Sequence, residues 1–340
     1  MAAKPFVSAV ICCYNYGRYV GQAIESALAQ NYPADRYEVI VVDDGSTDDT
    51  PEVVARYGDR IRSIRQENAG VLAATSAGIA AARGEFIATL DADDRWLPMA
   101  IPTLAAALRR DPQAALVQGD LRVVDDTERV VHASYRELAA LIDGPCSIRG
   151  QLVNRCRVNT NAMMFRRELV LPHLPFDTPC PYQDWWIALT LSRAGRFIAV
   201  PDVLALYRNH ASNFVLGTSA SGGVRRELPF RRWILCRPEE LAEASPVELQ
   251  QALLTFDYQV TVLARGGIAE LEELVPVDAG RLRAADAAMQ AASDALDAGR
   301  IQDAAAALAG AAAHNPFADA PRELLSQLVS LTTDATLAAA

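Results

Sequence analysis

A short apolar run that ends in three carboxylates places the strongest constraint on the fold of this chain. Residues 86–90 are apolar apart from Thr89, and Asp91, Asp93 and Asp94 follow directly. An apolar run of this length indicates a strand that is buried on both faces of a sheet. Open α/β sheets bind their ligands at the carboxyl ends of the strands. We therefore expect the three acids to lie at a ligand-binding edge.

Asp91 and Asp93 are separated by one residue, so on a continuing strand both side chains would point to the same side. Two carboxylates suit Mg²⁺ or Mn²⁺, which share their coordination shell with the phosphates of a substrate. An isolated Asp-x-Asp pattern also recurs by chance as a solvated acidic turn. The pattern alone leaves both interpretations open.

Strand and helix patterns alternate along the first ninety residues. This alternation predicts an α/β fold of the Rossmann-like type, with a mostly parallel sheet, right-handed crossovers and flanking helices. Since the chain has neither a P-loop nor a Gly-x-Gly-x-x-Gly motif, we expect a cation to balance any phosphate charge. The expected strands are 7–12, 39–42, 61–64 and 86–90, and the expected helices are 19–28, 50–57 and 71–82.

Strand and helix signals continue, with weaker periodicity, to about residue 215. Asp184 precedes an apolar helical stretch, so its side chain could cap that helix as well as perform chemistry. Residues 213–223 are rich in Ser and Gly and indicate a loop over the acceptor side of a site. The expected strands here are 115–118, 122–124, 130–132, 160–165, 197–200 and 203–207, and the expected helices are 99–110, 135–142 and 185–193.

Composition changes after about Pro238, where Ala becomes dominant and strand patterns vanish. We therefore predict two domains, an α/β domain at 1–237 and an all-α C-terminal extension at 238–340. Gly299 and Pro316 match positions of one tetratricopeptide-like hairpin, but such solenoids need about three or more repeats. A helical cap or a dimer contact explains the same helices, and the interpretations stay open. The expected helices are 246–264, 269–274, 281–298, 301–314 and 321–331.

Charge and cysteine content restrict the partners and the compartment. The net charge of −10 argues against nucleic-acid binding. No charge-free stretch approaches the about 20 residues that span a bilayer, and no two of the six cysteines have C-x-x-C spacing. Free cysteines favour a reducing compartment. We expect a cytoplasmic protein without a transmembrane segment, and a peripheral position at the inner face of the membrane stays open.

Several motifs, in order along the chain, resemble those of the family-2 nucleotide-sugar glycosyltransferases. The match covers roughly residues 5–215 and includes the triplet Gln-Asp-Trp at 183–185. The resemblance implies the GT-A fold and transfer of a sugar from a nucleoside-diphosphate donor. It is carried by Val-Ile-Cys-Cys-Tyr-Asn at 10–15, Val-Asp-Asp-Gly-Ser-Thr-Asp at 42–48, Ala-Arg-Gly-Glu-Phe at 82–86, Asp-Ala-Asp-Asp at 91–94 and Leu-Tyr-Arg-Asn-His at 206–210.

The resemblance also implies a role for each residue that matches a motif. Asp184 falls where the family has its catalytic base. Asp91, Asp93 and His210 would hold Mn²⁺ or Mg²⁺ with the diphosphate, although a lone His is as often structural. The residues implied in nucleotide-sugar binding are Cys12, Tyr14, Asn15, Asp44, Asn68, Gly70, Asp91, Ala92 and Arg208.

Three positions depart from the family pattern. A Cys pair that begins at Cys12 stands where Thr is usual, which changes a polar contact. Thr75 and Ser76 replace the usual Arg-Asn, so a basic contact to the donor is missing from this position. Gln183 replaces an acid, which removes a like charge that would raise the pKa of Asp184. We therefore expect an active enzyme with an unusual donor preference.

The leading hypothesis is a metal-dependent inverting glycosyltransferase that moves a sugar, with a UDP-sugar as the first choice, to a hydroxyl group. The acceptor would be a glycan or a lipid-linked molecule in surface-glycan or glycoconjugate biosynthesis. The cation would stabilise the leaving diphosphate, and Asp184 would take the proton of the acceptor. The alternative is a catalytically impaired module that binds nucleotide-sugar or glycan and recruits partners through its helical tail. That tail could also form a homodimer.

Overall fold

The structure is a computed structural model that describes residues 4–136, 148–210, 220–264, 274–316 and 318–338. The chain divides into two compact units. One, the sheet unit, comprises residues 1–148, 156–177 and 182–217, and the other, the helical unit, comprises residues 149–155, 178–181 and 218–340. The domain boundary expected at 237/238 stays a prediction.

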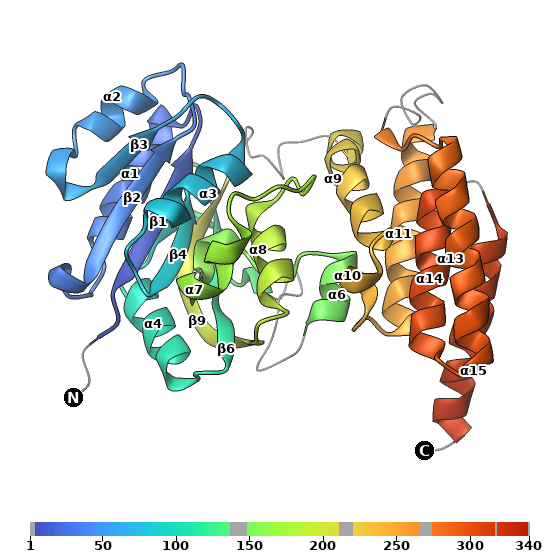
Figure 1. Ribbon diagram of the computed structural model, residues 1–340. Helices are drawn as coiled ribbons and strands as arrows, with labels where there is room; N and C mark the ends of the chain where they lie inside the picture. Colours follow the sequence, from blue (N-terminus) through green and yellow to red (C-terminus); the bar gives the residue numbers. More distant parts are fainter. Residues whose placement is uncertain (1–3, 137–147, 211–219, 265–273, 317, 339–340) are drawn as a thin grey trace. The chain divides into compact units, whose positions relative to one another are not determined.

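A mixed, mostly parallel sheet forms the centre of the sheet unit (Figure 1). Its strands are β1 (Val7–Cys13), β2 (Tyr37–Asp43), β3 (Arg62–Arg65), β4 (Phe86–Asp91), β5 (Arg95–Trp96), β6 (Ala114–Asp125), β7 (Val130–His132), β8 (Met163–Arg166) and β9 (Arg196–Asn209). Within the described residues their order is β3-β2-β1-β4-β8-β6-β9-β5, with β7 paired to β6. β8 runs antiparallel to β4 and β6, whereas β1, β2, β3 and β4 are parallel. The expected α/β class is confirmed.

Helices cover both faces of the sheet because the side chains of β1 alternate between two apolar layers. Odd-numbered side chains of β1 join one hydrophobic cluster with α1 (Gly17–Leu28) and α4 (Ala100–Arg110). The even-numbered Val10 and Cys12 face α3 (Val71–Ala81), and Cys12 Sγ lies 3.5 Å from Thr75 Oγ1 of that helix. Figure 1 shows α1 and α3 on opposite sides of β1. This two-sided burial explains why β1 reads as a continuous apolar run.

The strand register brings the acidic strand ends together. Cys13 of β1 pairs with Asp43 of β2, and Cys12 pairs with Asp91 of β4. The carboxyl ends of these parallel strands therefore meet at one edge of the sheet, on either side of β1. This is the arrangement in which an open α/β sheet binds ligands.

The division into short strands expected at 115–124 and 197–207 is wrong, and the condition of a strand that continues past Asp91 is not met. β4 ends at Asp91, where the chain turns and the amide of Asp94 donates to the carbonyl of Asp91 at 3.2 Å. The argument from strand alternation therefore does not orient Asp93. β6 and β9 are each one long strand rather than two short ones, since irregularities in their register near Asp120 accommodate Pro201 without ending the pairing.

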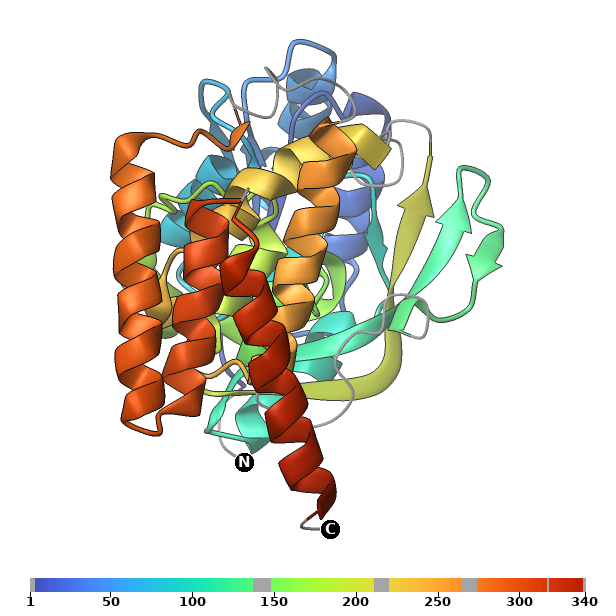
Figure 2. The same cartoon turned by 90° about the vertical axis from the view of Figure 1, so that its right-hand side faces the viewer.

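The helical unit consists of packed helices in the described part of the chain (Figure 2). α14 packs against α11, α13 and α15, and its Ala-rich sequence lets several helices approach it closely, since most of its alanines are buried. α9 was not expected, and the loop expected at 213–223 lies mostly outside the described residues, as do the helices expected at 135–142 and 269–274. The helices are α6 (Arg149–Asn154), α9 (Ala220–Leu235), α10 (Pro238–Leu241), α11 (Pro246–Ala264), α13 (Ala279–Asp297), α14 (Ile301–His314) and α15 (Ala320–Ala338).

A buried arginine closes the C-terminus of α14. Arg232 is only 3% exposed, and its guanidinium donates to the carbonyls of Ala313, His314 and Pro276 at 3.0, 3.0 and 2.8 Å. The last carbonyls of a helix have no partner within the helix and carry partial negative charge, so a cation is stabilising there. The tetratricopeptide-like interpretation of α13 and α14 stays a prediction.

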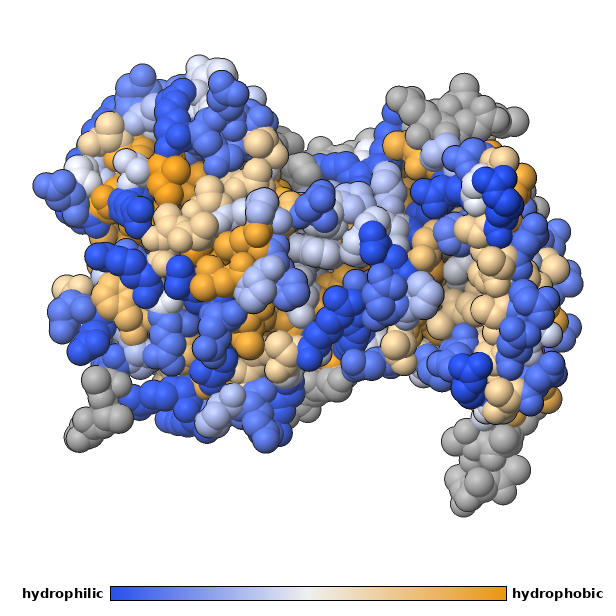
Figure 3. Space-filling model, in the orientation of Figure 1, coloured by the Kyte–Doolittle hydropathy of each residue, from blue (hydrophilic) through white to orange (hydrophobic). Residues whose placement is uncertain are grey.

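The surface of the helical unit that Figure 3 shows mixes polar side chains with small, weakly apolar ones, as expected for helices rich in alanine. Among the described residues, no helix combines the length and the apolar character needed to cross a membrane.

The close packing of α3 on the sheet yields a stability prediction. A Cβ added at Gly78 would come within 2.4 Å of Val10 Cγ1 and 3.2 Å of Val42 Cγ2, both on buried strands. We expect Gly78→Ala to lower the free energy of unfolding by about 1–3 kcal/mol through overpacking, although Ala favours helices by about 1 kcal/mol. Urea unfolding measures the change.

The matched control is Gly21→Ala in α1, where the new Cβ would have only ordinary contacts, the nearest 3.4 Å from Tyr57 Oη. This variant should be as stable as the wild type or slightly more stable, because Ala is the better helix former. A Gly78→Ala protein with undiminished stability would show that α3 does not need a glycine to approach the sheet.

Candidate active site

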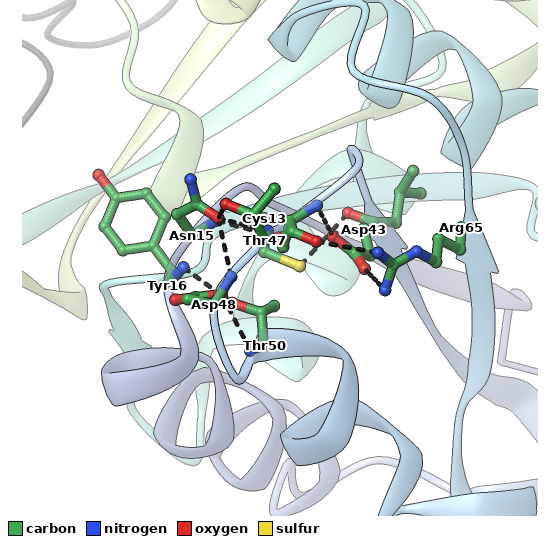
Figure 4. A network of polar contacts seen from close by, with 10 residues as sticks. Cys13, Asn15, Tyr16, Asp43, Thr47, Asp48, Thr50 and Arg65 are labelled. Atoms are coloured by element: carbon green, nitrogen blue, oxygen red, sulfur yellow. Dashed lines mark hydrogen bonds and ion pairs between the residues drawn. The ribbon is translucent and has the colours of Figure 1, made fainter.

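The turn after β1 is locked to the turn after β2 by Asn15 (Figure 4). Asn15 has a positive φ of 59°, a conformation that Asn tolerates better than most residues. Its Oδ1 accepts hydrogen bonds from the amides of Thr47 and Asp48 at 2.8 and 3.4 Å, and its own amide donates to Ser46 Oγ at 2.9 Å. Asn15, which was expected to bind the nucleotide-sugar, thus shapes the loop that would line the pocket.

An ion pair also supports the turn after β2. Asp43 Oδ2 lies 3.1 Å from Arg65 Nη1, and Asp43 Oδ1 accepts from the amide of Ser46 at 2.9 Å (Figure 4). Arg65 Nη2 also donates to the carbonyl of Ser46 at 2.9 Å. The ends of β2 and β3 are thereby tied together.

Asp44 holds the segment that contains Asn68 and Gly70. Its Oδ1 accepts from Gln66 Nε2 at 2.7 Å and from the amide of Ala69 at 3.0 Å, and its Oδ2 accepts from the amide of Gly70 at 2.8 Å. Gly70 has a φ of 87°, which explains the glycine at this point. Asp44 is only 3% exposed, whereas Asn68 and Gly70 are exposed. Asp44 therefore positions the two residues that a ligand can reach.

Cys12 and Tyr14 lie at and beyond the end of β1. Burial raises the pKa of the Cys12 thiol to about 12, so the side chain is a neutral thiol. Tyr14 is 44% exposed, directly after the buried strand β1. An exposed ring beside the strand ends is available to stack on a planar group.

Asn161 organises the acidic turn, and the sequence analysis missed this residue. Its Oδ1 accepts from the amide of Asp91 at 2.7 Å, and its Nδ2 donates to Asp91 Oδ2 at 3.1 Å and also to Asp94 Oδ2. It lies in the 3-10 helix Thr160–Ala162 and is fully buried, with its carbonyl accepting from Trp96 Nε1 at 2.6 Å. The signal available in the sequence was a polar pair inside a run expected to be an apolar strand.

β9 brings Arg208 and His210 to the same turn. His210 Nε2 lies 3.1 Å from Asp93 Oδ2, and the imidazole stacks on Tyr19 with ring centroids 4.8 Å apart. Arg208 donates through Nε to the carbonyl of Asp93 at 3.0 Å, and its amide donates to Asp94 Oδ1 at 2.7 Å. Arg208 is only 4% exposed. These contacts use Arg208 within the protein to hold the acidic turn.

The carboxylates of this turn repel one another. Burial, together with the charges of Asp93 and Asp184, raises the pKa of Asp91 to about 8. Burial and the charges of Asp93 and Asp91 raise the pKa of Asp94 well above its usual range. Ala92, between them, is buried. Clustered acids with raised pKa values at a sheet edge are typical of functional sites, and a cation would stabilise them all as carboxylates.

The residues present fit a divalent cation. Asp93 and His210 already converge within one hydrogen bond, and Asp91 supplies a further carboxylate in the same turn. Within the described residues no three His, Cys, Asp or Glu side chains form a ready cage. Mg²⁺ and Mn²⁺ need few protein ligands when water and substrate phosphates complete the shell.

Asp184 reaches the site from the first turn of α8 (Gln183–Leu191). The alternative role as N-cap does not apply, because the cap residue is Tyr182 and Asp184 lies inside the helix. Burial raises the pKa of Asp184 to about 6, although the amides of Trp185 and Thr160 and the thiol of Cys156 donate to it and oppose this shift. A carboxyl group with this pKa suits general-base catalysis near neutral pH.

Comparison with known proteins identifies the family. The model of "Glycosyl transferase family 2" matches residues 8–170. An uncharacterized glycosyltransferase of Nostoc sp. is 31% identical over 215 residues, which cover 61% of this chain and 66% of that protein. An uncharacterized protein of Mycobacterium tuberculosis is 30% identical over 299 residues, which cover 81% of this chain and 90% of that protein. The chain thus spans slightly less than two thirds of the Nostoc protein, and it spans 59% of an uncharacterized Mycobacterium bovis relative.

Solved structures share the fold at low identity. Residues 1–349 of Staphylococcus aureus TarS in complex with UDP-GlcNAc have a TM-score of 0.56 and 14% identity, covering 90% of this chain and 91% of that chain. The mannosyltransferase PcManGT of Pyrobaculum calidifontis, in complex with GDP-Man and Mn²⁺, has a TM-score of 0.54 and 20% identity. The match covers 93% of this chain and 88% of that chain. The expected GT-A-like fold is therefore confirmed. With its family model and its 30% identical relative, the chain belongs to glycosyl transferase family 2.

Proposed function

We propose that this chain transfers a sugar from a nucleoside-diphosphate donor to a hydroxyl group, with inversion at the anomeric carbon. The observation that carries the proposal is the proximity of two acidic groups with different environments. Gln183, which precedes Asp184 in the first turn of α8, donates from Nε2 to Asp91 Oδ1 at 2.8 Å, so the start of α8 lies at the carboxyl end of β4. The nearby charge of Asp184 contributes to the raised pKa of Asp91. One can serve the diphosphate while the other accepts a proton.

The diphosphate would lie over the acidic turn. Asp93, His210 and Asp91 would hold Mn²⁺ or Mg²⁺, which supplies electrostatic stabilisation of the leaving diphosphate. Arg208 and Asn161 keep the turn in place, since each of them bonds two of its members. The nucleoside would lie against Tyr14 and Cys12, beside the segment that Asp44 positions.

Asp184 would act as the general base. In its carboxylate form it would take the proton from the acceptor hydroxyl as the oxygen attacks the anomeric carbon opposite the diphosphate, which inverts the configuration. The transition state would resemble the oxocarbenium ion of glycoside chemistry. General-base assistance of this kind contributes about 10²- to 10⁴-fold to the rate.

The donor and acceptor belong to this proposal. We take a UDP-sugar as the first donor to test, because TarS was solved with UDP-GlcNAc, and a GDP-sugar as the second, because PcManGT was solved with GDP-Man and Mn²⁺. The acceptor would be a glycan or lipid-linked molecule of surface-glycan or glycoconjugate biosynthesis, met in the cytoplasm or at the inner face of the membrane. A homodimer or a protein partner would use the helical C-terminus.

The metal-dependent donor site is testable by calorimetry with UDP, GDP, dTDP and CDP, each with and without Mn²⁺. We expect one nucleotide to bind the wild type tightly only with Mn²⁺. Asp93→Asn should weaken that binding at least tenfold, because it removes the charge beside His210.

Asp59→Asn, an exposed acid in the 3-10 helix Gly58–Arg60, is the matched control and should bind as the wild type does. If the wild type binds none of the four nucleotides under either condition, the chain is not a nucleoside-diphosphate-dependent transferase.

The role of Asp184 predicts a split between turnover and binding. Asp184→Asn should lower kcat by about 10²- to 10⁴-fold while the affinity for the metal-nucleotide stays within a few fold, because the residue acts only on the acceptor. In the wild type, protonation of Asp184 below its pKa of about 6 removes the base. The rate should therefore fall tenfold per pH unit below about 6 and reach a plateau above it.

Turnover is measured as nucleotide release and sugar transfer with the donor that calorimetry identifies. If the wild type binds the nucleotide but shows no turnover, the alternative is favoured, in which the chain is a binding module.

A further inference from the structure

The three departures from the family pattern meet at one point in the sheet unit. Cys12 lies on β1, Thr75 on α3 and Gln183 at the start of α8. Cys12 Sγ lies 3.5 Å from Thr75 Oγ1, and Thr75 Oγ1 donates a hydrogen bond to Gln183 Oε1. Thr75 is fully buried and Gln183 is 6% exposed. Residues far apart in the sequence therefore form one contact chain.

This series of side-chain contacts ends on Asp91. Gln183 Nε2 donates to Asp91 Oδ1 at 2.8 Å and also lies 3.4 Å from Thr160 Oγ1. In the carboxylate form that a bound cation would stabilise, Asp91 only accepts hydrogen bonds, which matches the observed orientation with the NH₂ group of Gln183 facing Asp91. Gln183 Oε1 is then turned toward Thr75, whose hydroxyl can donate. Gln183 on one oxygen and Asn161 on the other hold the Asp91 carboxylate in a single orientation.

The contact has a consequence for charge. Thr75 and Gln183 are both neutral, so the side chains that contact one another beside Asp91 add no charge to the acidic turn. An acid at position 183 would face Asp91 across 2.8 Å with no donor between them, and a neutral residue at 75 would not compensate it. Ser76, the other changed residue, has a separate partner and accepts from the amide of Phe176 at 3.0 Å.

We propose that Gln183 is a positioning residue for the donor site, and that Thr75 and Gln183 work as a coupled pair. The Thr75 hydroxyl holds the Gln183 amide, and that amide holds Asp91 in the orientation that serves the metal-diphosphate. This inference rests on the proposed function, in which Asp91 contacts the bound metal-nucleotide.

The first test measures the affinity of the full chain for the nucleoside diphosphate, among UDP, GDP, dTDP and CDP, that binds the wild type most tightly with Mn²⁺. Gln183→Met keeps the length of the side chain and removes its polar contacts with Thr75, Asp91 and Thr160. We expect it to weaken binding about tenfold. Thr75→Val, which keeps the shape of threonine, should weaken binding by a smaller factor.

The control separates positioning from stability. Gln30 is also a buried glutamine, 8% exposed, and its side chain makes three hydrogen bonds, to Ser26, Leu97 and Ile101. Gln30→Met should lower the midpoint of urea unfolding at least as much as Gln183→Met but leave the nucleotide affinity at the wild-type value. Equal affinity losses in the two variants would assign Gln183 a merely structural role.

The pairing of residues 75 and 183 is tested by double variants. Thr75→Val combined with Gln183→Met should bind no more weakly than Gln183→Met alone, because Thr75 acts through Gln183. If the affinity loss of the double variant equals the product of the two single losses, the proposed coupling of Thr75 and Gln183 is overturned. In a second arm, Gln183→Glu should lose at least tenfold in affinity, because it places a second acid against Asp91. Thr75→Arg combined with Gln183→Glu should regain most of that loss, because the arginine supplies the opposite charge beside residue 183.

The outcomes separate this inference from the proposed function. Wild-type binding together with unchanged affinity in Gln183→Met would overturn the positioning role and leave the proposed function standing. A wild type that binds none of the four nucleotides with Mn²⁺ would overturn both. If the variant that combines Thr75→Arg and Gln183→Glu does not fold, the double-mutant cycle of Thr75→Val and Gln183→Met still decides whether the two positions are coupled.

Discussion

Repulsion among carboxylates that are removed from water is the constraint on which the site depends. Asp91, Asp93 and Asp94 occupy one turn at the end of β4, and Asp184 approaches it from α8. Such a group is stable only when neutral or positive donors surround it. Asn161, Gln183 and the backbone amide of Arg208 supply these donors from three different elements, and a bound cation would add the remaining compensation.

The residues that match family motifs divide into two groups by what they touch. Asn15 and Asp44 use their polar atoms on backbone amides of neighbouring turns, and Arg208 uses its guanidinium on the acidic turn. They shape the turns at this edge of the sheet. Tyr14 and Gly70 are exposed near the same strand ends, whereas Asp93 and Asp94 are buried. A substitution in the first group is expected to act through the shape of the loop rather than through a lost ligand contact.

Local sequence patterns predicted the elements whose apolar residues follow a regular pattern of burial. β1, β2 and β4 are apolar because both faces of the sheet are covered, and α1 is amphipathic because only one side faces β1. α9 was not predicted, because its sequence contains Pro229 and several arginines. Its helical state depends on packing against α11 and α14 in the helical unit. β6 and β9 were divided in prediction because Pro201 normally ends a strand, whereas their register irregularities accommodate it.

The sequence by itself determined the family, the α/β class and the sheet edge that carries the acids, because each of these depends on residues that are close in the chain. It did not determine the partners of the acids. Asn161 and Gln183 reach Asp91, and Thr75 reaches Gln183, only because the fold brings the turn before β8, the start of α8 and α3 together near the end of β4. Hydrogen bonds require distances near 3 Å, and only the tertiary structure decides which distant side chains come that close.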